Sequence, residues 1–352
     1  MGEKLFMQGN EALAESAIRA GCKFYCGYPI TPSSEIAEYY AKRMPEENGV
    51  FIQAETEVAA FNMIAGATAT GNRAMTATSG PGFSLGVEAM SFMAAAGLPA
   101  VIVDVMRPGP ADGDILAAQG DYFQVVKGGG HGDYNTIVLA PFSVQEMADL
   151  TPQAFELAEK YRNPVVIVSD GMLAKMMESV ELPEKIEQKK NFDWTLTGAK
   201  GRKHNVITTC ATGPEQWEQF NLELQKKFNT IAANEQRWEA YQIEDADFII
   251  VAFGSVARIA LSTIKKAREN GLKVGMIRPI TLWPFPKKAF AELKDKDFLV
   301  VELNAGQMVE DVKLAVPDKE RVFFYGRLGG VTPTPDELFN KIRELYAKNN
   351  QQ

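Results

Sequence analysis

The sequence contains few of the residues on which most metal and redox sites depend. Its 352 residues include three cysteines and two histidines. No two cysteines form a Cys-x-x-Cys pair, so the chain lacks the ligands of an iron–sulfur cluster. Zinc sites and histidine-based catalytic triads are equally poorly supported. Cys22 and Cys26 lie in an apolar run and are expected to be buried, although their even spacing leaves a redox or metal role open.

Positive charge and long apolar runs are also scarce. The 37 lysines and arginines are outnumbered by 45 aspartates and glutamates, which gives a net charge of −8 and disfavours binding to nucleic acid. No apolar run reaches the roughly 20 residues that cross a bilayer. The start of the sequence lacks the pattern of a signal peptide. These absences predict a cytoplasmic protein that binds neither membrane nor nucleic acid.

What the sequence does contain is a regular alternation of helices and strands. In the first half, strands are expected at 23–27, 50–54, 73–78, 100–104, 136–139 and 164–168, and helices at 8–20, 35–43, 56–70, 83–95 and 144–160. Strands separated by helices of this length favour a parallel sheet that is covered on both faces.

The alternation stops after the first half and then resumes. Between 176 and 243 a charged segment, 181–194, precedes one expected helix at 215–233. Beyond it, strands are expected at 248–253, 273–277, 298–301 and 321–325, and helices at 255–270, 287–293, 307–315 and 335–348. The sequence therefore predicts an α/β protein with domains at 1–175 and 244–352, joined by a linker region at 176–243.

Ligands of a parallel sheet collect at the loops that follow the carboxyl ends of its strands. In the loop 28–34, Pro29 and Pro32 restrict the backbone on either side of Thr31. The loop therefore holds the Thr31 hydroxyl in one place, as a ligand contact requires. An ordinary capped turn accounts for the same residues equally well.

Two glutamates, Glu55 and Glu57, follow the strand expected at 50–54. Carboxylates in the first turn of a helix usually do no more than complement the helix dipole. The helix behind Glu57 is rich in alanine, however, and small residues let a neighbour pack closely. Such packing would remove the Glu57 carboxylate from water and favour a role in proton transfer.

A third loop, Ser79–Gly86, has glycines at 80, 82 and 86, and Asp104 follows at the end of the next expected strand. The pattern is similar to a dinucleotide-binding fingerprint, although the spacing is one residue too long and Pro81 occupies the turn. A glycine-rich turn that lets a neighbour approach closely is the alternative.

Arg107 follows the strand expected at 100–104, in a segment rich in glycine and proline. An arginine held in such a loop can bind a carboxylate through two parallel hydrogen bonds. A structural salt bridge is the alternative.

Taken together, these segments resemble the 2-oxoacid:ferredoxin oxidoreductases, in particular the subunit with the pyrimidine-type domain of thiamine enzymes. The loop 28–34 resembles the family's substrate-side motif. Glu57, followed nine positions later by Gly66, resembles the activating glutamate of thiamine enzymes, and Glu55 fits that spacing less well. Arg107, followed by Gln119-Gly120-Asp121, resembles the family's arginine segment.

The resemblance continues through the second half of the chain. Residues 278–286 (Arg-Pro-Ile-Thr-Leu-Trp-Pro-Phe-Pro) and 302–308 (Glu-Leu-Asn-Ala-Gly-Gln-Met) are similar to the family's transketolase C-terminal-like domain. The resemblance therefore implies a parallel-sheet thiamine-diphosphate-binding domain of the pyrimidine type, followed by a transketolase C-terminal-like α/β domain.

The resemblance also implies roles for individual residues. Glu57 is expected to hydrogen-bond the aminopyrimidine ring of thiamine diphosphate and to promote loss of the proton at C2. Pro29 and Ile30 are expected to contact the same cofactor. Thr31 and Arg107 are expected to hold the carboxylate of a 2-oxoacid, which leaves as CO2 while coenzyme A collects the acyl group and ferredoxin the electrons.

Two parts of such an enzyme are missing from the sequence. Thiamine enzymes hold diphosphate and Mg²⁺ with a Gly-Asp-Gly motif and a later asparagine, which neither 112–114 nor 169–171 matches. Cysteines for clusters are absent as well. The resemblance therefore implies partner subunits, one binding the diphosphate and Mg²⁺ and one ferredoxin-like with iron–sulfur clusters, and an active site at a subunit interface.

The substrate expected from the resemblance is a branched-chain 2-oxoacid, 2-oxoisovalerate, with 2-oxoglutarate next. Where the 2-oxoglutarate type has two hydroxyl residues after its arginine, this chain has Ala111 and Asp112, and the Asp112 carboxylate would repel a second substrate carboxylate. Two alternatives stay open: an NAD-dependent dehydrogenase, and a non-catalytic subunit with a degenerate thiamine fold.

Overall fold

The computed structural model describes residues 4–188 and 192–349. A sheet of seven strands, ordered β12-β6-β7-β5-β4-β2-β3, forms the centre of the first half. Six of the strands are parallel: β2 (Phe24–Gly27), β3 (Val50–Gln53), β4 (Ala74–Thr78), β5 (Val101–Met106), β6 (Ile137–Leu139) and β7 (Val165–Asp170). Every residue of β4, β5 and β7 is buried, as expected of parallel strands covered on both faces.

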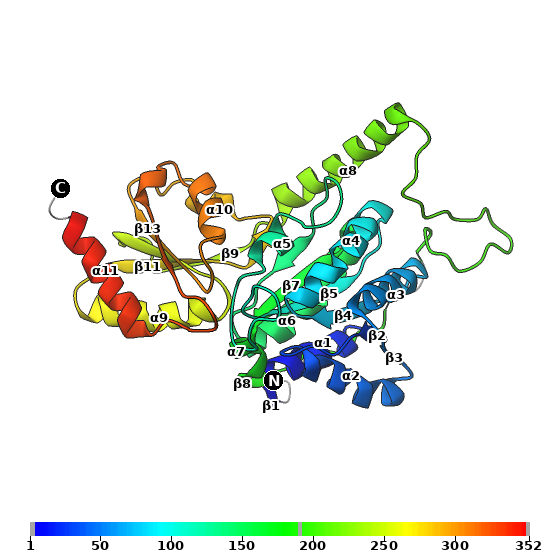
Figure 1. Cartoon of the computed structure of the whole chain (residues 1–352), viewed down its shortest axis with the longest axis horizontal. Helices are drawn as coiled ribbons and strands as arrows, with labels where there is room; N and C mark the ends of the chain where they lie inside the picture. The colour runs from blue at the N-terminus through cyan, green and yellow to red at the C-terminus, as the bar shows by residue number, and fades with distance from the viewer. Residues whose placement is uncertain (1–3, 189–191, 350–352) are drawn as a thin grey trace.

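Helices cover both faces of this sheet, which confirms the predicted α/β architecture (Figure 1). They are α1 (Gly9–Arg19), α2 (Ser34–Glu47), α3 (Glu57–Ala69), α4 (Pro81–Ala96) and α6 (Val144–Tyr161). The helix α1 packs against α6 and α2, and α3 packs against α4. Side-chain hydrogen bonds fix the residues at which α3 and α6 begin. The Thr56 hydroxyl accepts a hydrogen bond from the Ala59 amide, and the Ser143 hydroxyl accepts one from the Glu146 amide.

The second half forms a sheet of five strands, ordered β14-β13-β10-β11-β9. The strands β10 (Phe248–Val251), β11 (Val274–Pro279), β13 (Asp297–Glu302) and β14 (Val322–Gly326) are parallel, and β9 (Trp238–Tyr241) is antiparallel to β11. The helices α9 (Gly254–Glu269), α10 (Met308–Ala315) and α11 (Pro335–Asn349) accompany it. Each lies within two residues of its expected start and end.

The short elements were not predicted. The strands β1 (Lys4–Gln8) and β8 (Met177–Glu181) form an antiparallel pair, and β12 (Thr281–Trp283) pairs antiparallel with β6. The helices α5 (Tyr122–Val126) and α7 (Gly171–Lys175) are five residues each. The helix expected at 287–293 is a 3₁₀ turn, η1 (Lys287–Phe290). Elements this short have too few residues to show a period.

The two sheets exchange strands across the proposed linker. The strand β9 comes from the stretch 176–243 and joins the second sheet, whereas β12 comes from the second block and joins the first. Each sheet thus contains a strand from outside its own predicted range. The division into 1–175, 176–243 and 244–352 does not coincide with the two sheets and stays a prediction.

Arg278 connects the two halves. It is almost fully buried at 1% exposure and donates hydrogen bonds to Glu146 of α6 at 2.7 Å and Glu239 of β9 at 2.9 Å. Its guanidinium also stacks on Phe142, 3.9 Å from the ring centroid. The first of the two C-terminal segments, 278–286, therefore fastens the second sheet to the first.

The helix α8 (Pro214–Asn234) projects from the body together with the extended segment that precedes it (Figure 1). It confirms the helix expected at 215–233. Only Phe228 and Ile231 of α8 are buried, so most of its surface faces solvent. Residues 189–191 of the charged segment 181–194 lie outside the described residues.

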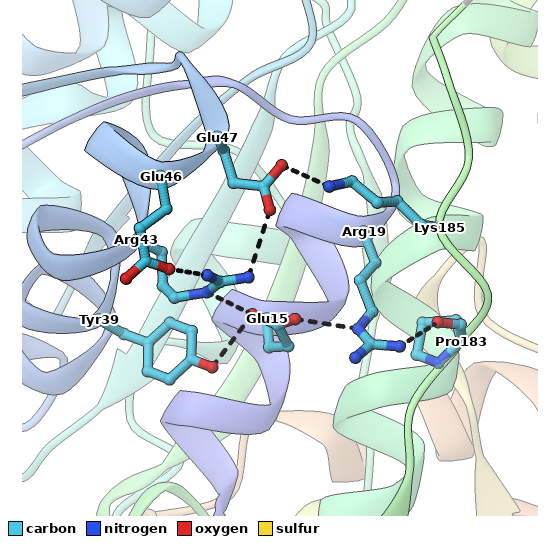
Figure 2. A network of polar contacts seen from close by, with 8 residues as sticks. All are labelled: Glu15, Arg19, Tyr39, Arg43, Glu46, Glu47, Pro183 and Lys185. Carbon is cyan, nitrogen blue, oxygen red and sulfur yellow. Dashed lines mark hydrogen bonds and ion pairs between the residues drawn. The ribbon is translucent and has the colours of Figure 1, made fainter. Parts of the chain in front are cut away.

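Glu15 of α1 is the centre of an ion-pair cluster that joins α1 to α2 (Figure 2). Its buried carboxylate accepts hydrogen bonds from Arg19 Nε at 2.9 Å, Tyr39 Oη at 3.0 Å and Arg43 Nε at 3.2 Å. Arg43 also pairs with Glu46 and Glu47. Because three donors converge on Glu15, removing that one carboxylate leaves all of them without their shared acceptor.

We expect Glu15→Ala to lower the free energy of unfolding by about 2–3 kcal/mol, since partly buried donors lose a charged acceptor. The control Glu46→Ala removes an exposed carboxylate and should cost less than about 0.5 kcal/mol. Guanidinium unfolding of both variants measures the difference. Equal shifts would show that the cluster is an ordinary set of surface ion pairs.

Candidate active site

The loops after β2, β4 and β5 meet at the carboxyl end of the first sheet. Arg107, just beyond β5, donates a hydrogen bond from Nη1 to the main-chain oxygen of Thr31 at 2.9 Å. Two residues predicted to bind one substrate group are thus in contact although 76 positions separate them. The contact uses the Thr31 carbonyl, whereas the prediction named its hydroxyl.

The loop 28–34 closes on itself in the way a capped turn does. The carbonyl of Ile30 accepts hydrogen bonds from the amide and the hydroxyl of Ser33, at 3.0 and 2.8 Å. Pro29 is exposed and Ile30 is partly exposed. The ordered turn therefore presents the apolar side chains of Pro29 and Ile30 at the sheet edge, where they are open to a ligand.

A cavity of about 630 Å³ lies at this edge between the two halves of the chain. Its charged lining residues are Arg107 and Asp121, and the rest of the lining is small, apolar or amide-bearing: Gly80, Pro81, Ser84, Pro108, Gly109, Pro110, Ala111, Ala118, Gly120, Leu303, Asn304, Ala305, Gln307, Leu328 and Gly329. A single cation in a mostly apolar cavity suits a ligand with one anionic group.

Gln119 attaches this segment to the second half. Its buried side chain donates to the Phe253 carbonyl at 2.9 Å and accepts from the Leu303 amide at 3.1 Å, while Asn304 donates to the Gln119 carbonyl at 2.8 Å. Glu302 holds Asn304 in turn, at 2.9 Å. The segment 302–308 therefore forms the far wall of the cavity.

Glu57 lies at the start of α3 and is buried, with 7% of its surface exposed. Among residues 4–188 and 192–349, none donates a hydrogen bond to its carboxylate. A side chain on Gly82 would meet Glu57 Oε1 at 2.5 Å and Thr78 Oγ1 at 2.2 Å, and that buried hydroxyl also lacks a partner. Glu55 is exposed. Of the two glutamates, only Glu57 is buried without a partner, which is the environment of a ligand-binding acid.

Residues 15–242 match the sequence family of thiamine-diphosphate-binding pyruvate flavodoxin/ferredoxin oxidoreductases, and residues 246–338 match the core domain II of pyruvate:ferredoxin oxidoreductases. The chain belongs to the 2-oxoacid:ferredoxin oxidoreductases. These matches confirm the fold class predicted from the sequence, a thiamine-binding domain followed by a second α/β domain.

Individual relatives agree with this membership. The chain is 47% identical over 347 residues to a ketoisovalerate oxidoreductase subunit, VorB, of Methanothermobacter marburgensis, with 98% of each chain covered. It is 40% identical over 358 residues to the 2-oxoglutarate synthase subunit KorA of Methanocaldococcus jannaschii, covering 95% of this chain and 97% of the relative.

A solved structure of the 2-oxoglutarate:ferredoxin oxidoreductase from Magnetococcus marinus superimposes with a TM-score of 0.89 at 30% identity. The alignment covers 97% of this chain and 65% of that one, so this chain spans less than two thirds of the length of that relative. The proteins it matches are oxidoreductase subunits, and this chain is accordingly a subunit of an oxidoreductase.

The family matched by residues 15–242 binds thiamine diphosphate, and this part of the chain contains polar groups that are free to bind a ligand. The Glu57 carboxylate and the Thr78 hydroxyl both pack closely against Gly82, where an added Cβ would clash with each of them. Neither group has a hydrogen-bond partner among the described residues. A ring that donates and accepts hydrogen bonds would satisfy them. No group of three or more metal-binding side chains occurs among the described residues.

The glycines of the loop 79–86 have structural roles, which removes the support for a dinucleotide site. Asp104 is fully buried and accepts a hydrogen bond from the Gly80 amide at 3.3 Å, so its carboxylate faces the interior and not a ribose. A side chain on Gly86 would meet the ring of Phe61 at 2.4 Å. Close packing, the alternative reading of these glycines, explains them.

The structure does not support the argument that the Asp112 carboxylate repels a second carboxylate of the substrate. Ala111 and Gly113 have φ angles of 60° and 61°, and the turn they form directs Asp112 into solvent, away from the cavity lining. The carboxylate in the cavity belongs to Asp121, whose role sequence reasoning missed. Its position two residues after Gln119, within the quoted arginine segment, was the available signal.

Cys22 and Cys26 are buried free thiols, as expected. Burial raises the pKa of Cys22 to about 12 and that of Cys26 to about 11, so neither forms the reactive thiolate near neutral pH. The Sγ of Cys26 lies 3.3 Å from Met63 Sδ. Cys22 precedes β2 and is not part of the strand.

Among the described helices, none is long and apolar enough to cross a membrane.

We expect Gly82→Ala to destabilise the chain by roughly 1–3 kcal/mol, because the new methyl group forces the Glu57 and Thr78 side chains to move. Gly66 of α3 is the matched control, since a Cβ there meets nothing within 4 Å. Gly66→Ala should stabilise the helix by roughly 0.5–1 kcal/mol. Thermal unfolding distinguishes the two variants, and a neutral Gly82→Ala would show that the space beside Glu57 is not restricted.

Proposed function

We propose that this chain supplies the cofactor-activating acid and the substrate-carboxylate site of an oxidative decarboxylase. The reaction converts a 2-oxoacid to its acyl-CoA and CO2 and passes electrons to ferredoxin. The observation that carries the proposal is Glu57, a buried residue whose carboxylate accepts no hydrogen bond from the described residues. The Magnetococcus relative supports the substrates, since its structure holds 2-oxoglutarate and coenzyme A.

Glu57 is the proposed catalytic residue. Its carboxylate would hold the aminopyrimidine ring of thiamine diphosphate by a hydrogen bond and would exchange a proton with it. Pro29 and Ile30 contact the same ring with the apolar side chains they present at the sheet edge. When bound, thiamine diphosphate supplies the carbon nucleophile that adds to the 2-oxoacid carbonyl.

Arg107 and Thr31 are the proposed substrate residues. Among the described residues, Thr31 is the one hydrogen-bond partner of the Arg107 side chain, and its buried Nε has none. Part of the guanidinium is therefore available to a substrate carboxylate. Leu303 and Leu328 provide apolar surface in the same cavity. The lining offers no second cation, which favours branched-chain 2-oxoisovalerate over 2-oxoglutarate. The ketoisovalerate relative agrees with this preference.

The partner that binds diphosphate and Mg²⁺ is proposed to cover the outer face of α3 and α4. Large apolar side chains are exposed there, namely Val58, Met63, Leu85 and Phe92, and Gly66 opens on the same side of α3. Exposed apolar surface of this kind usually marks a protein interface. Glu57 begins α3, so a partner on this face would complete the site. A ferredoxin-like subunit would hold the iron–sulfur clusters, and the assembly is proposed to be cytoplasmic, where its thiols stay reduced.

Glu57→Gln tests the catalytic role. We expect the assembled enzyme to lose roughly 10²–10⁴-fold in kcat, because glutamine cannot exchange the proton, while assembly and folding persist. The control Glu55→Gln alters an exposed glutamate two residues away and should retain nearly full activity. The assay is reduction of viologen that depends on coenzyme A, and full activity of Glu57→Gln would remove Glu57 from the mechanism.

Arg107→Ala tests the substrate role. The KM for the 2-oxoacid should rise roughly 10–100-fold, since the substrate loses a charge-assisted hydrogen bond. The KM for coenzyme A serves as the internal control and should stay within about twofold. Equal increases in the two KM values would assign Arg107 to the structure of the loop.

A further inference from the structure

Two carboxyl groups are buried next to Arg107 without the partners that ionised carboxylates require. Asp104, in β5, is fully buried, and Asp121, which precedes α5, is 9% exposed. Each has one oxygen with a donor: the Gly80 amide for Asp104 Oδ1 at 3.3 Å, and Gln124 for Asp121 Oδ1 at 2.6 Å. The second oxygen of each, Oδ2, is buried and has no hydrogen-bond partner among the described residues.

The two carboxyl groups are neighbours at Gly80. The Gly80 amide binds Asp104, and a side chain built on Gly80 would meet Asp121 Oδ2 at 3.8 Å and Arg107 Cγ at 3.6 Å. Two ionised carboxylates so placed repel one another, and each loses hydration on burial. One proton relieves both difficulties, because it removes one of the two buried negative charges.

We propose that Asp104 and Asp121 share one proton, and that this proton keeps the charge of Arg107 available to the carboxylate of the substrate. The inference deepens the proposed function and rests on it for the identity of that ligand. If both aspartates were ionised, they and Arg107 would carry a net negative charge and repel an anionic substrate. With one shared proton the three groups are neutral, and the cavity admits a monocarboxylate.

The charged groups around the pair support this assignment. Burial and the charge of Asp121 raise the pKa of Asp104 well above its usual value, and burial raises the pKa of Asp121 to about 6. Arg107 is the cation that acts on the pair. The pair therefore has one proton over a window that opens near pH 6, where Asp121 ionises, and closes when Asp104 loses its proton.

Glu57 also lies at this edge, against Gly82, whereas three further carboxylates there have partners of their own. Asp170 at the end of β7 accepts from the Met172 and Leu173 amides, Glu302 accepts from the Met308 and Val309 amides, and Asp311 binds Tyr122 and Lys127. The neighbouring side chains from β4, α5 and the segment 303–307 are uncharged: Thr78, Ser79, Gln124, Asn304 and Gln307. The pair and Arg107 are thus the groups whose charge changes the field in the cavity.

Asp121→Asn is the decisive variant, because its amide can donate to Asp104 in place of the shared proton. The variant cannot carry two negative charges, whether or not Asp104 is ionised. In the wild-type assembled enzyme we expect the KM for the 2-oxoacid to rise on the order of tenfold as the pH increases and the pair loses its remaining proton. In Asp121→Asn this dependence of the KM on pH should be absent.

A purely structural role for Asp121 would leave the pH profile of KM with its wild-type shape, and that result would overturn the proposal.

A second readout is independent of turnover. The infrared difference spectrum between the wild-type and Asp121→Asn enzymes at neutral pH should contain the C=O stretch of a protonated carboxylic acid. Its absence overturns the shared proton whatever the substrate proves to be. If the band is present but no 2-oxoacid is oxidised, the shared proton stands and the proposed function fails. Asp104→Asn, if it folds, should remove the same band.

Discussion

The parallel register of the first sheet is the constraint on which the candidate site depends. Because β2, β3, β4, β5 and β7 run in one direction, the loops at their carboxyl ends meet at one edge. The buried strands are apolar along their length, and polar groups accumulate where they end. Several of these groups, namely Thr78, Ser79, Asp104, Arg107 and Asp121, have buried atoms without a partner. Unsatisfied polar atoms are costly, and their concentration at one edge indicates a site built for a ligand.

The second half of the chain holds this edge in shape. Gln119 and Asn304 join the segment between β5 and α5 to the second sheet, and Arg278 joins the sheets at a separate point. Both contacts come from the segments that carry the family resemblance in the second half. The segments of the second half that resemble the family thus form buried hydrogen bonds that position the cavity walls. The residues with proposed roles in the chemistry all belong to the first half.

The sequence predicted the long elements well because their periods are regular and their caps are recognisable, as at Thr56 and Ser143. It did not predict β9 or β12, whose three or four residues pair only because tertiary contacts bring them to a sheet edge. In the site, the pairing of Arg107 with Thr31 followed from the family motif. The Asp104–Asp121 neighbourhood did not, because two positions that are 17 residues apart give no sign of contact until the loop at Gly80 is folded.

The claim that this chain contains half of a thiamine site can be tested by thiamine diphosphate binding before and after assembly. Calorimetric titration of the isolated chain, and of the same chain purified with its partner subunits, compares the two states directly. The account predicts weak or undetectable binding to the isolated chain and tight, Mg²⁺-dependent binding to the assembly. Tight binding to the isolated chain, unaffected by partner or Mg²⁺, would contradict it.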